Sequence, residues 1–252
     1  MFSELLPLTV NELFLCIVII FIAYVLKGLS GFGSGLVAIP LLAFFLPIPF
    51  IVPVLALLSY TGTVYQSIRY RKDVVWRDLL PLLPFSLAGI TIALWLLINV
   101  NVTVLTFTLG VFIFCYAVYS LLPHNIKSGS RWWAIAAGSF AGLIGALFGT
   151  GGPFYVLYLK MRQVNKQQFR ATITMIFLVD GGARMFGYYY SDLFTYKMLL
   201  LALVLLPVLI LAMYVGQHLH IKINDNRFNQ VVSILLLVSG LSLAVKSIYL
   251  MV

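Results

Sequence analysis

Charged side chains are scarce in this chain. Asp, Glu, Lys and Arg make up 9% of the 252 residues, whereas 62% of the residues are hydrophobic. Soluble domains have about 25% charged and roughly 45–50% apolar residues. A water-soluble fold of this size could not cover its surface with so few charges. The composition therefore excludes a soluble protein, and the chain is predicted to contact lipid.

Residues that could catalyse a reaction or bind a metal are also few. The three histidines (His124, His218 and His220) lie near the ends of apolar runs, and Asp180 is the one acid clearly inside such a run. A membrane metalloprotease or acyltransferase needs His, Glu or Asp together at membrane depth. The chain has no GxxxxGK(S/T) loop, so it is not itself an ATP-driven pump. We predict no enzymatic activity, no catalytic residues, no metal site and no cofactor.

Cysteines and signal-peptide features are nearly absent. Cys16 and Cys115 lie inside separate apolar runs without CxxC spacing, so neither a disulfide nor a zinc site is predicted, and both are interpreted as small buried hydrophobic residues. The first twelve residues contain Glu4 and Glu12 but no Lys or Arg, which does not match the cationic start of a secretory signal. The first apolar run is expected to remain in the mature protein.

Long apolar runs are what the chain does have. A helix needs about 20 apolar residues to cross a bilayer, and a barrel strand would alternate polar and apolar residues, which these runs do not. The pattern predicts an all-α polytopic membrane protein with about eight full spans. Two segments, 36–47 and 153–161, are too short to cross and are interpreted as broken or re-entrant half-helices. The ten predicted segments are 11–27, 36–47, 50–70, 76–98, 103–122, 131–148, 153–161, 168–190, 195–217 and 228–250.

The net charge of +9 follows membrane topology rather than nucleic-acid binding. Most of the 16 basic residues fall on alternate connections between the predicted segments, as the positive-inside rule requires of cytoplasmic loops. We therefore predict membrane lipid as a partner, no nucleic acid, and a multi-pass protein of the cell (inner) membrane. Ten crossing segments would place both termini outside, and this orientation depends on whether the two short segments cross the membrane. The sequence does not indicate an oligomeric state. The residues on these connections are Lys27, Arg69, Arg71, Lys72, Arg77, Lys127, Arg131, Lys160, Arg162, Lys166, Arg170, Lys222 and Arg227.

The chain contains a weak internal repeat. The stretch GLSGFGSG at 28–35 aligns with GLIGALFGTGG at 142–152, with a proline following each at Pro40 and Pro153. Internal similarity of this kind is typical of transporters built from two repeats. We predict a first repeat at 1–123 (about 11–122 in the membrane), a cytoplasmic linker at 124–131 and a second repeat at 132–252. Five segments per half would give the two repeats inverted topology.

The two glycine clusters are the candidate binding site. Each precedes a short apolar segment, so each is predicted to end one helix and begin a half-helix whose free N–H groups form an anion site. Hydroxyls of Ser30, Ser34 and Thr150 would add donors. The alternative is packing, because Gly138, Gly142, Gly145 and Gly149 have the small-xxx-small spacing that lets helices approach. The other members of this candidate site are Gly31, Gly35, Gly149, Gly151, Gly152 and Pro153.

Arg184 stands inside an apolar run, four residues after Asp180. A charge inside a membrane span is costly and is usually functional, and an i,i+4 pair shares one helix face. Two interpretations remain open. The pair neutralises itself and fixes packing, or Arg184 contributes to anion binding or Asp180 carries a coupling proton. Lys27, beside the first glycine cluster, is interpreted as an end-of-helix lysine that extends toward the membrane surface.

The motifs GLSGFGSGLVAIPLL and AGLIGALFGTGGPF, with RATITMIFL at 170–178, resemble the TauE/SafE sulfite exporter family, also called the 4-toluenesulfonate uptake permease family. The resemblance covers about residues 11–250. It implies an inner-membrane transporter for sulfite, sulfonates or other sulfur-containing organic acids. One departure is that Ser34 and Leu36 flank Gly35 where many relatives have more glycine. The motif positions are Gly31, Gly33, Gly35, Gly145, Gly149, Thr150, Gly151, Gly152, Pro153, Arg170, Ala171 and Thr172.

The leading hypothesis is therefore a secondary transporter of a small anion that works by alternating access. The resemblance adds an export or permease role and a sulfur-containing substrate. Two alternatives stay open, namely a transporter of another small solute and a membrane scaffold subunit that transports nothing.

Overall fold

The structure is a computed structural model that describes residues 8–30, 33–122, 127–218 and 225–251. Every regular element in these ranges is a helix, which confirms the predicted all-α class. Three short elements, η1 (Arg71–Asp73), α5 (Trp76–Leu79) and η2 (Leu80–Leu82), connect two of the longer helices. The longer helices are α2 (Val10–Ser30), α3 (Ser34–Leu42), α4 (Ile48–Tyr70), α6 (Leu83–Asn99), α7 (Val102–Leu121), α8 (Trp133–Phe148), α9 (Gly152–Met161), α10 (Lys166–Tyr190), α11 (Tyr196–His218) and α12 (Asp225–Met251).

Several helices have the length and composition of membrane spans. Within the described residues, four stretches are long and apolar enough to cross a bilayer: Val10–Gly28, Trp76–Asn99, Val102–Leu121 and Tyr196–Gly216. Large apolar side chains such as Phe14, Trp95 and Leu203 are exposed on them. An exposed apolar surface of this extent is expected where lipid is the solvent, so a polytopic membrane protein is confirmed.

Two predicted segments differ from the structure. The segment predicted at 36–47 is helical only to Leu42. The segment predicted as one helix at 76–98 is divided into α5, η2 and α6, which together span Trp76–Asn99. Pro81 and Pro84 lie at this division. Proline lacks a backbone N–H and collides with the preceding turn, so two prolines three residues apart interrupt the regular α-helix there.

The chain forms two compact units, each of which is described by itself. The first contains 1–51, 100–124 and 199–252, and the second contains 52–99 and 125–198. Both units take segments from both sides of the predicted 124–131 linker. The units therefore do not coincide with the predicted repeats.

In the first unit, glycine allows the helices to approach closely. A Cβ on Gly28 of α2 would lie 2.9 Å from the Cα of Gly216 in α11, and a Cβ on Gly110 of α7 would lie 2.8 Å from the carbonyl oxygen of Gly240 in α12. Further along the same two helices, Ser233 Oγ donates to Ser120 Oγ at 3.0 Å. From Gly110 to Ser120 along α7, the contacting residue of α12 goes back from Gly240 to Ser233, so α7 and α12 are antiparallel.

In the second unit, α6 and α8 pack through glycines and run parallel. A Cβ on Gly138 would lie 2.7 Å from the carbonyl oxygen of Leu82, and a Cβ on Gly142 would overlap the carbonyl of Ser86. A Cβ on Gly89 would lie 2.7 Å from the amide nitrogen of Leu143. The packing interpretation of the α8 glycines is therefore confirmed for Gly138 and Gly142, because neither position has room for a side chain.

Candidate functional site

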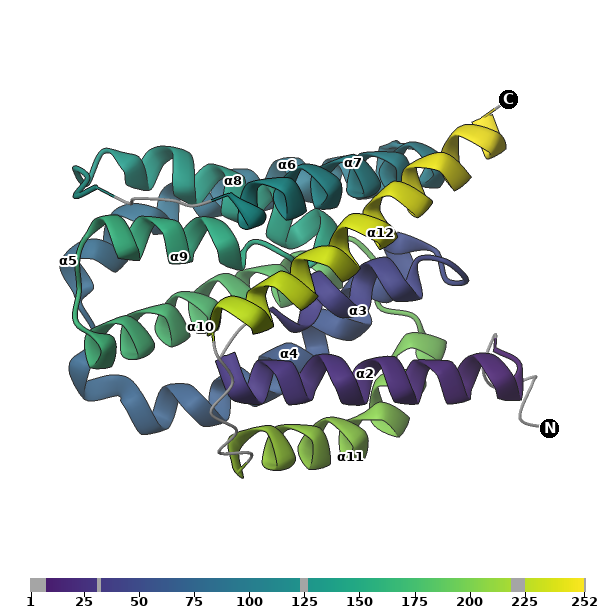
Figure 1. Ribbon diagram of the computed structural model, residues 1–252, viewed down its shortest axis with the longest axis horizontal. Helices are drawn as coiled ribbons and strands as arrows, with labels where there is room; N and C mark the ends of the chain where they lie inside the picture. Colours follow the sequence, from purple (N-terminus) through teal and green to yellow (C-terminus); the bar gives the residue numbers. More distant parts are fainter. Residues whose placement is uncertain (1–7, 31–32, 123–126, 219–224, 252) are drawn as a thin grey trace. The chain divides into compact units, whose positions relative to one another are not determined.

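Helices α8 and α9 form a hairpin within the second unit (Figure 1). Near the turn, the rings of Phe140 and Phe154 stack with centroids 5.8 Å apart. At the opposite end, the amide of Gly129 donates to the carbonyl of Met161 at 2.9 Å. Helix α9 therefore returns along α8, and the ten residues Gly152–Met161 end beside the start of α8. The short segment predicted at 153–161 is this returning arm.

The hairpin turn depends on glycine. Gly149 ends α8 with a φ of 60°, in the left-handed region that favours glycine, and its amide donates to the carbonyl of Gly145 at 2.9 Å. A Cβ on Gly151 would overlap the carbonyl of Ala141 in α8 and lie 3.0 Å from the Cα of Gly145. The sequence GTGG thus provides both a left-handed turn and the close approach of α9 to α8.

The start of α9 has donors without protein partners. Gly151 precedes the helix as its N-cap, makes no side-chain cap, and Pro153 at the second helical position has no N–H to satisfy. Thr150 is 2% exposed, and its hydroxyl is buried with no hydrogen-bond partner. A buried hydroxyl without a partner costs about 1–3 kcal/mol, so it calls for a physical reason.

Asp180 and Arg184 of α10 form a buried ion pair. Arg184 Nη2 lies 2.6 Å from Asp180 Oδ2, and the two side chains are 12% and 1% exposed. The predicted pairing across one helix turn is therefore confirmed, and the two charges neutralise each other. Arg184 Nη1 also donates to the carbonyl of Gly145 at 2.8 Å, whereas its Nε is buried without a hydrogen-bond partner.

The other oxygen of the carboxylate is bound by residues that sequence reasoning missed. Ser86 Oγ on α6 and Tyr155 Oη on α9 each donate to Asp180 Oδ1 at 2.8 Å. Asp180 thereby connects α6, α9 and α10. Since these partners lie 94 and 25 residues away along the chain, no local pattern could have indicated them.

The C-terminal end of α8 receives two donors from α10. Besides Arg184 at the Gly145 carbonyl, Tyr188 Oη donates to the carbonyl of Ala146 at 2.7 Å. Carbonyls in the last turn of a helix carry partial negative charge, so a guanidinium and a hydroxyl stabilise them. The Gly145 carbonyl accepts from Arg184 in addition to the amide of Gly149. A methyl group placed on Gly145 would lie 3.5 Å from both Arg184 Nη1 and Gly151 Cα, so Arg184 reaches the turn itself.

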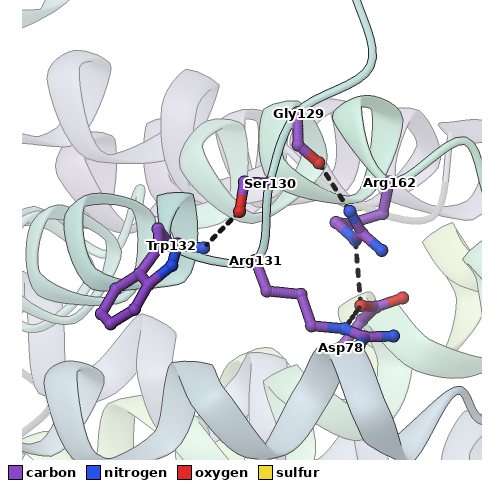
Figure 2. A network of polar contacts seen from close by, with 6 residues as sticks. All are labelled: Asp78, Gly129, Ser130, Arg131, Trp132 and Arg162. Atoms are coloured by element: carbon purple, nitrogen blue, oxygen red, sulfur yellow. Dashed lines mark hydrogen bonds and ion pairs between the residues drawn. The ribbon is translucent and has the colours of Figure 1, made fainter.

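A second ionic cluster fixes the base of the hairpin (Figure 2). Asp78 is buried, and its Oδ1 accepts from Nε of Arg131 and of Arg162, each at 3.0 Å. Arg162 also donates to the carbonyl of Gly129. The two arginines flank the hairpin, just before α8 and just after α9. One carboxylate thus holds both arms. Sequence reasoning counted these arginines only as loop cations; the missed signal was an acid at the start of an apolar run.

The first glycine cluster lies in the first unit. Gly33 has a φ of 92°, and the buried Ser34 begins α3, followed by Gly35. Gly31 lies outside the described residues. This confirms a helix break followed by a short helix.

Lys27, at the end of α2, is only 5% exposed, so the prediction that it extends toward the membrane surface was wrong. The prediction that both cysteines are buried is confirmed for Cys16 and wrong for Cys115, which is exposed.

The remaining motif residues brace the second unit. Thr172 is fully buried, and its Oγ1 accepts from the amide of Val75, the residue before α5, at 2.9 Å. Ala171 is buried beside it, whereas Arg170 is exposed. These positions therefore connect α10 to the segment that carries Asp78 rather than reaching the hairpin turn directly.

The fold defines a class of protein: a multi-pass helical protein with charged groups and a helix break enclosed among apolar helices. Comparison with known proteins narrows this class. The family model described as "Sulfite exporter TauE/SafE" matches residues 16–243, and the chain belongs to that family. It is a membrane transporter of the inner membrane, surrounded by lipid.

The chain is also similar to a curated membrane protein. The chain is 27% identical over 179 residues to the "Probable inner membrane transporter protein TsaS" of Comamonas testosteroni, covering 68% of this chain and 73% of the relative. No solved structure matches the chain significantly.

Proposed function

We propose that the protein is a secondary transporter of a small sulfur-containing anion, namely sulfite, a sulfonate or another sulfur-containing organic acid. The anion binds at the α8–α9 turn and crosses by alternating access. The family description names sulfite export, which supports both the substrate class and an exporter role. The hairpin turn supports an anion site, because a helix start with uncapped N–H groups attracts negative charge.

The observation that carries this proposal is the unsatisfied hydroxyl of Thr150. It lies between the end of α8 and the start of α9 and is buried without a partner. An oxyanion oxygen accepting from this hydroxyl, and from the amides of Gly151 and Gly152, would satisfy donors that the protein leaves unmet. Hydrogen bonds to a charged group contribute about 1.5–3 kcal/mol each, enough to offset the cost of leaving the hydroxyl unpaired in the empty protein.

Arg184 and Asp180 hold the residues of the turn in position. Through Gly145 the guanidinium fixes the last turn of α8, and Asp180 holds the guanidinium in place. Arg184 Nε is a further buried donor without a partner and is the part of the side chain available to the anion. Pro153 fixes the first turn of α9 without adding a competing donor.

Two inverted repeats, 1–123 and 132–252, provide the alternating access. Three observations support this. The last helices of the two halves, α7 and α12, are antiparallel, as equivalent helices of inverted repeats should be. The first and second helices of each half pack on each other, as α2 with α3 and α8 with α9. The first long helix of each half also packs against the fourth long helix of the other half: α2 contacts α11, and α8 contacts α6. Ser34 and Gly35 begin the equivalent half-helix.

A ligand-dependent stability measurement tests the anion site. We expect methanesulfonate, 4-toluenesulfonate and sulfite to raise the thermal stability of the protein in lipid nanodiscs. A ligand at a hundred times its Kd stabilises the folded state by about 2.7 kcal/mol. Dimethyl sulfone, which has the same tetrahedral sulfur without the charge, is the matched control.

The control decides between the competing functions. Equal stabilisation by dimethyl sulfone would contradict an anion site and favour a transporter of neutral solutes. Stabilisation by none of the compounds, together with no flux of labelled sulfonate in either direction across proteoliposomes, would favour the scaffold hypothesis.

A further inference from the structure

Resting on the proposed function, we infer that the α8–α9 turn is selective for oxyanions with one negative charge. Sulfonates and hydrogensulfite bind there, whereas the dianions sulfite and sulfate are discriminated against. The turn has the donors for an oxyanion but no net charge to balance a second negative charge.

The charge at the turn is set by Arg184 and Asp180. Their 2.6 Å contact cancels one positive against one negative charge. Asp180 stays committed to this pair, because its other oxygen accepts from Ser86 and Tyr155. Arg184 contributes donors to the turn, then, but no unbalanced charge.

No other charged side chain in the described part of the second unit is placed against the turn. The titratable groups next to the ion pair and the turn are tyrosines: Tyr155 on α9, Tyr188 on α10, and Tyr60, whose ring lies beside Gly181 and Gly182 of α10. The cations Lys160 of α9 and Lys166 and Arg170 of α10 are near the ends of their helices that are away from the turn, and so is Tyr158. The cluster of Asp78 with Arg131 and Arg162 lies at the other end of α9. Ten helical residues separate that end from the turn by about 15 Å.

The remaining attraction suits a single charge. Unpaired amides at a helix start are equivalent to roughly half a positive charge. Removing an ion from water costs free energy that grows with the square of its charge, so a dianion loses far more hydration than a monoanion. The amides, the Thr150 hydroxyl and Arg184 Nε can replace the hydration of a sulfonate. For a dianion, their added attraction to the second charge is smaller than the added hydration that the ion loses.

Sulfite provides a direct test, because it changes charge near neutral pH while sulfonates do not. We expect the apparent affinity of purified protein in nanodiscs for total sulfite to fall as pH rises from about 6 to about 9. Once hydrogensulfite is the minor form, the fall approaches about tenfold for each pH unit. Methanesulfonate, measured over the same range, reports any titration of the protein itself, and sulfate is the permanent dianion.

The outcomes separate the inference from the proposed function. A fall in sulfite affinity against a flat methanesulfonate affinity, with sulfate at least about tenfold weaker than methanesulfonate, is the expected result. Sulfate binding as tightly as methanesulfonate, or sulfite affinity that does not fall relative to methanesulfonate, would overturn the inference and leave the anion site standing. Absence of binding by every anion at every pH would overturn both.

Discussion

Replacing Arg184 by glutamine is expected to destabilise the protein strongly, because it leaves the Asp180 carboxylate buried without its cation. Asp180→Asn should act in the same way by leaving the guanidinium uncompensated. Removing one partner of a buried ion pair costs about 3–5 kcal/mol. Both Arg184 donors would be lost in the first variant, including the one to the Gly145 carbonyl at the end of α8.

A double-mutant cycle isolates the pair. The variant carrying both Asp180→Asn and Arg184→Gln should lose less stability than the sum of the two single variants, because neither charge is left alone. Unfolding is measured on purified protein in the same lipid environment, with Arg77→Gln, an exposed arginine of the second unit, as the control. Single variants as stable as the Arg77→Gln control would show that the pair has no structural role.

Gly151→Ala is expected to lower anion-dependent flux strongly. The added methyl group would overlap the carbonyl oxygen of Ala141 and press on the Cα of Gly145, both backbone atoms of α8 that cannot rotate away. Helix α9 must therefore shift, and its N-terminal amides shift with it. Overpacking of this kind costs about 1–3 kcal/mol in stability, and displacing the amides should lower sulfonate flux by at least about tenfold.

Gly182→Ala is the matched control for this prediction. It also adds a methyl group to a glycine of the second unit, but the nearest atom is Tyr60 Oη at 3.3 Å, the end of a side chain that can adjust. Its flux should stay within about twofold of the unmodified protein. If Gly151→Ala transports sulfonate at the unmodified rate, the close approach of α9 to α8 is not needed for transport.

The membrane helices could be predicted because the bilayer imposes a length on each apolar run. Segments such as 103–122 and 168–190 differ from α7 and α10 by one or two residues. Where proline interrupts an apolar run, hydropathy is misleading: Pro81 and Pro84 divide the segment predicted as one helix at 76–98. The Asn165–Gln168 capping box shows why α10 begins at Lys166, two residues before the predicted segment.

The candidate site was predictable only where its residues are neighbours in the sequence. Asp180 and Arg184 are four residues apart, and the GTGG turn is contiguous, so both could be recognised. Ser86, Tyr155 and Tyr188 were not recognised because a Ser or Tyr in an apolar run carries no local sign of its distant partner. The same holds for Lys27, whose burial depends on how other helices cover α2.

Asp78 illustrates the intermediate case. It is an acid at the start of an apolar run, surrounded in sequence by cations, and that contrast could have marked it. What the sequence could not supply is that Arg131 and Arg162, 31 residues apart in number, flank one hairpin and meet on one carboxylate oxygen (Figure 2). The hairpin is a consequence of Gly149 and Gly151, and only its geometry brings the two arginines together.

Thr150→Val in parallel with Thr63→Val is the most direct test of anion binding at the α8–α9 turn. Thr63 is also buried, but its hydroxyl donates to the carbonyl of Ser59 at 2.9 Å and should not contact the anion. Thr150→Val is expected to leave the empty protein as stable as before or more stable, because an unpaired buried hydroxyl is removed, and to weaken sulfonate binding about tenfold or more. Thr63→Val should leave sulfonate affinity unchanged. An unaltered sulfonate affinity in Thr150→Val would contradict anion binding at this turn.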